Sequence, residues 1–179
     1  MSQPILRISE EAIQRQMDQI AQRISSDYQG REVVVVGVLK GAFIFMADLI
    51  RKLTIPLTID FVQVASYGTS TVSSGDISMK LPIGTDVAGK HVLLVEDIVD
   101  TGITIRYLID YLKALGAASV AVCALIDKSE RRETPVPIDY ACLNVSKGFL
   151  VGYGLDHAER YRNLSAIYEV VDSDPTVPH

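Results

Sequence analysis

The chain has 179 residues, of which 48% are hydrophobic and 22% charged, and its formal net charge is −5. A chain of this length and composition forms roughly one domain with a substantial core, so we expect a single domain over residues 1–179 and exclude an intrinsically disordered protein. The sequence has no apolar run near the ~18 residues of a membrane helix, and its negative charge argues against a general nucleic-acid-binding surface.

The first half of the chain alternates helical and strand patterns. Residues 9–26 are predicted to form a helix, because Ser9 can cap the first turn and apolar residues follow at helical spacing. The β-branched run 32–39 lacks polar alternation, which indicates a strand buried on both faces. We expect an apolar helix over 42–51 and an alternating strand over 57–65.

The second half continues this alternation after a Ser/Thr/Gly-rich segment, 66–75, which we expect to be a mobile loop. Apolar runs predict strands at 91–96, 119–127 and 139–145, and an apolar stripe predicts a helix over 103–115. Strands separated by helices at these lengths are typical of an α/β fold with a mostly parallel central sheet flanked by helices.

The two ends of the chain lie outside the alternation, and they can form a small lobe beside the sheet. The N-terminal residues lack the pattern of a secretory signal, and the two cysteines, Cys123 and Cys142, lie inside apolar runs. We therefore expect buried, reduced thiols in a cytoplasmic protein.

The most informative segment leads from an apolar strand through acidic residues into a helix. Glu96, Asp97 and Asp100 follow the strand, and 101–104 is a short Thr/Gly loop before the helix. Ligands of open α/β sheets bind at such carboxyl ends of strands. Backbone amides, hydroxyls and a helix N-terminus favour a phosphate, whereas the acid pair suits a diol or a hard cation such as Mg²⁺. A phosphorylated ribose satisfies both; the plainer alternative is a solvated loop in which Asp100 only caps the helix.

The segment VLLVEDIVDTGIT resembles the phosphoribosyl-pyrophosphate (PRPP) signature of type I phosphoribosyltransferases, and the wider pattern resembles the hypoxanthine/guanine phosphoribosyltransferase family. Supporting segments are VGVLKGAFIFMADLI (36–50), SYG (66–68), ALIDKSE around Lys128, and FLVGYGLD (149–156). The resemblance implies the type I fold with a small hood lobe from the chain ends. It also implies Mg²⁺-dependent transfer of the phosphoribosyl group of PRPP to hypoxanthine and guanine, with release of IMP or GMP and pyrophosphate.

The resemblance assigns roles on the PRPP side of the site. Glu96 and Asp97 would hold the ribose hydroxyls, directly or through Mg²⁺, and Asp156 would help to bind a second Mg²⁺. The group that would bind the ribose phosphate is Asp100, Thr101, Gly102, Ile103 and Thr104. The pyrophosphate would contact Lys40, Gly41 and Arg162, next to a Leu39–Lys40 peptide that is often cis in the family.

The resemblance also assigns roles on the purine side. Asp100 would accept a proton at purine N7, a task for which a carboxylate within one hydrogen bond is chemically adequate. Lys128 would donate to O6 and so select a 6-oxopurine; if the strands are parallel, it lies at the same sheet edge as Asp100. Phe149 would stack on the ring and the backbone of Leu150 would bind its edge. Ser66 and Tyr67 would fold over the site and exclude water.

Three positions depart from the family pattern. Ile103 stands where many relatives have Lys, and Asn163 stands where Asp is usual. Gly148 precedes Phe149 where relatives often carry Lys or Arg, which leaves the choice between hypoxanthine, guanine and xanthine open.

Other readings of the sequence have less support. A pyrimidine substrate conflicts with Lys128 and Phe149. A non-catalytic, PRPP-sensing regulator of nucleic acid would need a basic face, but the only tight basic group is Lys128, Arg131 and Arg132. A phospho-receiver domain also gathers acids at strand ends, yet it would not need the Thr/Gly loop. We expect small-molecule substrates, no nucleic-acid or membrane partner, and, as the family implies, a homodimer or homotetramer.

Overall fold

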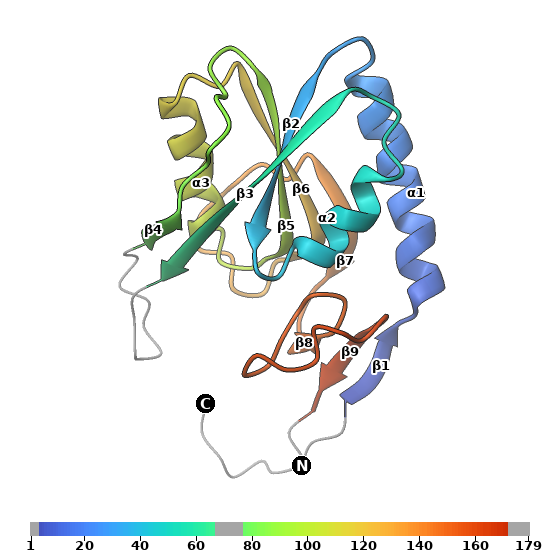
Figure 1. Ribbon diagram of the computed structural model, residues 1–179. Coiled ribbons are helices and arrows are strands. Elements are labelled where there is room, and N and C mark those ends of the chain that lie inside the picture. Colours follow the sequence, from blue (N-terminus) through green and yellow to red (C-terminus); the bar gives the residue numbers. More distant parts are fainter. Residues whose placement is uncertain (1–3, 67–76, 172–179) are drawn as a thin grey trace.

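The computed structural model describes residues 4–66 and 77–171, and its centre is a six-stranded sheet in the order β4-β3-β2-β5-β6-β7 (Figure 1). Neighbouring strands are parallel, except that β4 is antiparallel to β3. The strands are β2 (Val33–Leu39), β3 (Leu57–Ser66), β4 (Ile77–Leu81), β5 (His91–Val99), β6 (Ser119–Lys128) and β7 (Tyr140–Val145). The predicted α/β fold with a mostly parallel sheet is confirmed.

Helices cover both faces of this sheet. α1 (Glu10–Asp27) and α2 (Phe43–Ile50) pack on one face, and α3 (Ile103–Ala114) packs on the other. α1 begins where its sequence predicts, because the Ser9 hydroxyl accepts a hydrogen bond from the backbone N–H of Ala12 at 3.2 Å.

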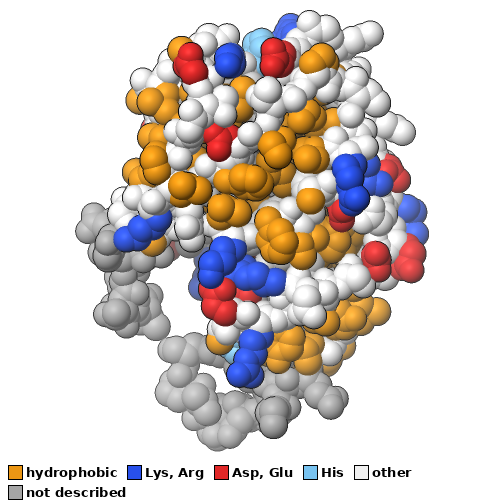
Figure 2. All heavy atoms as spheres, in the orientation of Figure 1, with side chains coloured by type: hydrophobic (Ala, Val, Ile, Leu, Met, Phe, Trp, Pro, Cys, Tyr) orange, Lys and Arg blue, Asp and Glu red, His pale blue; other side chains and the backbone are white. Residues whose placement is uncertain are grey.

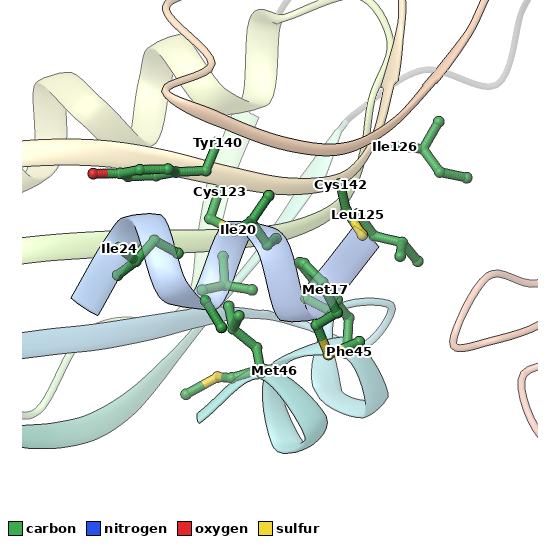
Figure 3. Packing of buried hydrophobic residues seen from close by; sticks show 14 of the residues in the cluster. Met17, Ile20, Ile24, Phe45, Met46, Cys123, Leu125, Ile126, Tyr140 and Cys142 are labelled. Carbon is green, nitrogen blue, oxygen red and sulfur yellow. The ribbon is translucent and has the colours of Figure 1, made fainter. Parts of the chain in front are cut away.

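Strand β2 lies between the two helical layers. Val33 and Val35 belong to the core under α1 and α2, whereas Val34 and Val36 belong to the core under α3. A strand covered on both faces needs no polar alternation, which accounts for the continuous valine run. Figure 3 shows the first core, where side chains of α1 and α2 meet those of β6 and β7. Its sulfur atoms include the buried free thiols of Cys123 and Cys142.

The chain ends form a second, three-stranded antiparallel sheet in the order β1-β9-β8, which we call the hood. It comprises β1 (Pro4–Ile8), β8 (Leu150–Val151) and β9 (Ile167–Val170). Figure 1 shows the hood beyond the carboxyl ends of β2 and β3. The Tyr153 hydroxyl ties it to the body by donating to Asp48 of α2 and accepting from Gln14 Nε2 of α1 at 3.2 Å. The lobe expected from the chain ends is thus present.

The strand order reverses direction between β2 and β5. From β2 the chain moves outward to β3 and β4, then returns to the other side of β2 as β5 and continues to β6 and β7. Helices following β2 and β5 lie on opposite faces, so the connections diverge at this point. Such a topological switch point is where open α/β sheets bind ligands, at the carboxyl ends of the strands.

Three sequence expectations need correction. β5 extends to Val99 rather than ending at Glu96, so Glu96 and Asp97 are strand residues and not part of a loop. β6 includes Lys128, which was expected just past the strand. β4 was not predicted, because an isolated five-residue edge strand has little periodicity to detect. None of the helices within the described residues has the length and hydrophobicity that crossing a membrane requires.

Candidate functional site

A small polar pocket opens where β5 passes into α3. Gly102 stands at the N-cap position with φ +84°, in the left-handed region that a side chain disfavours. A Cβ there would lie 2.3 Å from the Thr134 backbone oxygen, so the turn requires glycine. The pocket has a volume of about 160 Å³. Its lining is Glu96, Asp97, Ile98, Val99, Asp100, Thr101, Gly102, Thr104 and Ile105. The free amides of the α3 N-terminus suit it to an anion.

This pocket contains six of the seven residues predicted to bind the ribose hydroxyls or the ribose phosphate. The seventh, Ile103, is the first residue of α3, and its backbone N–H donates to the Thr101 hydroxyl at 3.4 Å. Asp100 does not act as the helix cap, because Gly102 occupies that position.

The acid pair at the end of β5 carries an electrostatic cost. Glu96 is buried and Asp97 half-buried. Desolvation raises the pKa of both carboxyls, and the neighbouring charge of Asp97 raises that of Glu96 further. A bound cation would relieve this repulsion.

The carboxylates of Glu96 and Asp97 suit Mg²⁺ better than they suit a cation whose ligands would all have to come from the protein. Within the described parts of the chain, no three His, Cys, Asp or Glu side chains gather into a group able to hold a metal. Mg²⁺ is typically held by one or two carboxylates, with water and substrate oxygens completing its coordination. Glu96 and Asp97 therefore fit an ion that arrives with a substrate.

The predicted pyrophosphate loop packs directly against the acid pair. The Leu39–Lys40 peptide is cis, as the resemblance implied. A Cβ on Gly41 would lie 1.6 Å from Asp97 Oδ2, and a Cβ on Gly154 would lie 2.2 Å from the Gly41 carbonyl oxygen. Only glycines permit these approaches, so the ends of β2 and β5 and the segment around Gly154, which follows β8, converge at the switch point.

Lys40 and Arg162 both bind the carboxylate of Glu159. Lys40 Nζ lies 3.0 Å from Glu159 Oε2, and Arg162 Nη2 lies 3.5 Å from each of its oxygens. These cations lower the pKa of Glu159, Lys40 most strongly. Arg162 also pairs with Asp156 at 2.8 Å and donates to the Gly154 carbonyl oxygen at 2.8 Å. Two cations from distant parts of the chain thus converge on one anionic group.

A second cluster surrounds Asp100. Lys128, at the end of β6, is buried, and its Nζ lies 3.6 Å from Asp100 Oδ2 and 3.5 Å from Glu130 Oε2. The expected meeting of Lys128 and Asp100 at one sheet edge is confirmed. Arg131 donates to the same Asp100 Oδ2 from Nε at 3.0 Å and from Nη2 at 2.5 Å. Asp100 Oδ1 is buried and accepts no hydrogen bond from the described residues.

Two of the other predicted residues, Phe149 and Leu150, lie at the hood strand β8. Phe149 is 51% exposed, and its ring meets that of His157 edge-on at 5.1 Å. Leu150 is buried as the first residue of β8. Ser66 is the last residue of β3, while Tyr67 lies outside the described residues.

Sequence reasoning missed three charged contributors to the site. Arg131 and Arg132 were noted only as part of a basic group with Lys128, yet both bind Asp100. Arg131 binds its carboxylate, and Arg132 Nε donates to its carbonyl oxygen at 2.7 Å. Their position just after Lys128 was an available signal. Glu159 lies among other charged residues of one loop, and nothing in that pattern indicates its link to Lys40.

Comparison with known proteins agrees with this geometry. The family model described as phosphoribosyl transferase domain matches residues 7–158. The chain is 43% identical over 160 residues to the hypoxanthine-guanine phosphoribosyltransferase of Bacillus subtilis, covering 89% of each protein. It is 44% identical over 168 residues to that of Aquifex aeolicus, covering 93% of this chain and 94% of the relative. A crystal structure of a hypoxanthine-guanine phosphoribosyltransferase from Bacillus anthracis is similar with a TM-score of 0.89 at 40% identity, covering 96% of this chain and 99% of that one.

Proposed function

Because this chain belongs to the phosphoribosyl transferase family, we propose that it is the enzyme that transfers the phosphoribosyl group of PRPP to hypoxanthine and guanine. The N9–C1′ bond forms as the bond from C1′ to the pyrophosphate oxygen breaks, and pyrophosphate leaves with the bonding electrons. The observation that carries the proposal is the 3.6 Å pair of Lys128 and Asp100 beside an anion pocket at the switch point. This geometry offers a donor and a proton acceptor to one flat, polar base.

The purine side uses the residues around Asp100. We infer that the Asp100 carboxylate, whose Oδ2 lies 3.6 Å from Lys128 Nζ, accepts the proton of purine N7. Lys128 donates to O6, which discriminates against a 6-amino base because two donors would then face each other. The exposed ring of Phe149 stacks on the base, and the backbone of Leu150 binds its edge.

The phosphate side uses the α3 N-terminus and the cations at Glu159. Asp100, Thr101, Gly102, Ile103 and Thr104 surround the ribose phosphate in the proposal. In the proposal, Lys40, Gly41 and Arg162 bind pyrophosphate. This assignment is supported by Lys40 and Arg162, which already bind one anionic group, the carboxylate of Glu159. Ser66 and Tyr67 would cover the site.

Mg²⁺ is the cofactor that the acidic residues suit. Glu96 and Asp97 would hold one ion with the ribose hydroxyls, and Asp156 would hold a second after exchanging its contact with Arg162. When bound, the ion supplies positive charge that stabilises the leaving pyrophosphate.

We propose that the protein works as a homodimer or homotetramer in the cytoplasm, on small-molecule substrates. Support for assembly comes from hydrophobic side chains that gather over β3 and α2 in Figure 2. Phe43, Ile59 and Leu81 are between 42% and 47% exposed, although large hydrophobic residues favour burial. The two buried free thiols suit a reducing compartment. Light scattering after size exclusion measures the mass, and a monomer at micromolar concentration contradicts the assembly.

The decisive experiment is a steady-state assay with PRPP and Mg²⁺ that offers hypoxanthine, guanine, xanthine, adenine and uracil in parallel. We expect turnover of hypoxanthine and guanine that exceeds turnover of adenine and uracil by at least a hundredfold, on the order expected for a polar recognition site. Chelation of the metal should abolish the turnover of hypoxanthine and guanine, and added Mg²⁺ should restore it. Saturable PRPP binding without turnover of any base would instead identify a PRPP sensor.

Glu159 provides a test of the pyrophosphate subsite. In Glu159→Gln, Lys40 and Arg162 lose their internal carboxylate, so pyrophosphate should bind about three- to fivefold more tightly, the range typical of exposed ion pairs. Calorimetric titration of pyrophosphate measures the change. The matched control is Glu32→Gln, an exposed glutamate next to the amino end of β2, which should leave the affinity unchanged. Weaker or equal pyrophosphate binding by Glu159→Gln would contradict the assignment.

A further inference from the structure

The hydrogen-bonded ladder between β5 and β6 ends just before the two residues that would contact the base. Its last paired residues are Val99 and Asp127. Asp100 and Lys128 follow them directly in the two segments, and their side chains lie 3.6 Å apart, from Lys128 Nζ to Asp100 Oδ2. The spacing of this pair therefore needs a support other than the ladder.

The guanidinium of Arg132 supplies hydrogen bonds at this point. Its Nε donates to the carbonyl oxygen of Asp100 at 2.7 Å, and its Nη2 donates to that of Lys128 at 3.1 Å. Nη2 also donates to the carbonyl oxygen of Val99 at 2.9 Å and to Asp127 Oδ1 at 2.6 Å. One side chain thus bridges the last pair of the ladder and the pair that follows it. The planar group of arginine, with its five donors, suits such a bridge.

The Arg132 side chain is held more firmly than an ordinary surface arginine. It is 20% exposed, whereas that of the neighbouring Arg131 is 68% exposed. Its charge is paired with Asp127, and Gly102 leaves room for it, because a Cβ on that glycine would lie 3.2 Å from Arg132 Cδ. Hydrogen bonds from a charged donor are stronger than those between neutral groups, so this bridge is able to fix the backbone that it contacts.

The phosphate pocket has a separate support from the same connection. Backbone N–H groups of Glu133 and Thr134 donate to the Thr101 carbonyl oxygen at 3.0 and 2.9 Å. These bonds do not involve the Arg132 side chain, so the Thr/Gly turn keeps them when that side chain is replaced. Loss of the guanidinium should therefore disturb the purine side of the site more than the phosphate side.

We propose that Arg132 is a positioning residue for the transfer reaction: it holds the carbonyl oxygens of Asp100 and Lys128 so that both side chains meet one base. The inference rests on the proposed function, because it assumes that a purine binds beside this pair. Arg132 acts through the backbone of the two residues and need not touch either substrate. The spacing of the pair matters because a displacement of about 1 Å can cost roughly a hundredfold in rate.

The test compares Arg132→Gln and Arg132→Lys with the unmodified protein. In Arg132→Gln, kcat/KM for hypoxanthine should fall roughly 10- to 100-fold, with part of the loss in KM, because the donor and the acceptor lose their spacing. The ratio of hypoxanthine to adenine turnover should fall as well. Arg132→Lys should recover part of both, since lysine keeps the charge but lacks the planar fork. PRPP affinity, measured by calorimetry, should change by less than about threefold in both variants.

These readouts separate positioning from a purely structural role. A less stable protein contains fewer active molecules, which lowers kcat but leaves KM and base selectivity unchanged. Unchanged KM and selectivity in Arg132→Gln therefore overturn the inference, and so does an equal loss of PRPP affinity, while the proposed function stands. Should Arg132→Gln fail to fold, Arg132→Lys decides by the same readouts. An unmodified protein without turnover of any base overturns both proposals.

Arg51→Gln is the matched control. Arg51 also binds a carboxylate and a main-chain carbonyl oxygen, those of Asp48 and, at 3.1 Å, Ala47, but both partners lie on α2. This variant should keep kcat, KM and base selectivity, and thermal midpoints measure how much stability each variant loses. A loss of base selectivity as large as that of Arg132→Gln would contradict the inference.

Discussion

Asp100→Asn is expected to lower kcat for hypoxanthine by roughly 10²- to 10⁴-fold, the range that a positioned acid–base group contributes. Asparagine has nearly the same shape, but its amide does not accept a proton from the base. Its oxygen can still accept from Arg131, so the loop should keep its arrangement. Steady-state kinetics measure kcat. Calorimetry should find PRPP affinity changed by less than about threefold, because the substitution keeps the backbone amides and the Thr101 and Thr104 hydroxyls of the phosphate pocket, and the ribose and pyrophosphate contacts involve other groups.

The comparison variant is Asp110→Asn, which makes the same change on the exposed face of α3. It should retain full activity. Should Asp100→Asn also work at near the normal rate, the proton acceptor must be another group. A variant that lost PRPP affinity and turnover together would instead indicate that Asp100 serves mainly to bind the ribose phosphate.

The second large effect is expected from Lys128→Ala, with a fall of roughly a hundredfold or more in kcat/KM for hypoxanthine. Lys128 is buried, so its removal deletes the donor to O6 and withdraws a positive charge from Asp100 in a poorly solvated place. PRPP binding should weaken far less. The ratio of hypoxanthine to adenine turnover should also fall, because the lost ammonium is what distinguishes O6 from an amino group.

Lys113→Ala, at an exposed position of the last turn of α3, controls for loss of one positive charge. Circular dichroism and thermal unfolding should accompany the kinetics, since a buried residue is being replaced. Equal losses in purine use and PRPP binding would contradict a role in base recognition, and so would an unchanged selectivity against adenine.

The site also explains how an acidic protein can bind a polyanion. The net charge of −5 describes the whole surface, but a phosphate responds to charges within about a Debye length of ~8 Å. Locally the described residues offer Lys40, Arg162 and the amides of the α3 N-terminus. The acid pair of Glu96 and Asp97 would then work against anion binding unless a cation accompanied the substrate. We therefore expect PRPP affinity to depend on Mg²⁺.

Local sequence was sufficient for most of the secondary structure and for one half of the site. Burial sets both the continuous valine run of β2 and the periodic apolar stripes of α1 and α3, so each of these patterns is visible in the sequence itself. The acid pair, Asp100 and the Thr/Gly turn are continuous in the chain, so a strand followed by a helix is enough to bring them together. The resemblance to a known family added roles for distant residues.

Apart from the expected meeting of Lys128 and Asp100 at one sheet edge, the tertiary structure decided which charged groups touch. The contact of Lys128 with Asp100 spans 28 residues of sequence, and that of Lys40 with Glu159 spans 119. The close approach of Gly41 to Asp97 depends on β2 and β5 being neighbours, which follows from strand order and not from either segment. β5 continues to Val99 because β6 pairs with it that far, although acidic residues make a poor strand by themselves. Periodicity records burial, whereas ion pairs across the fold leave no periodic trace. For that reason the contact of Arg131 with Asp100 and that of Glu159 with Lys40 emerge only from the folded chain.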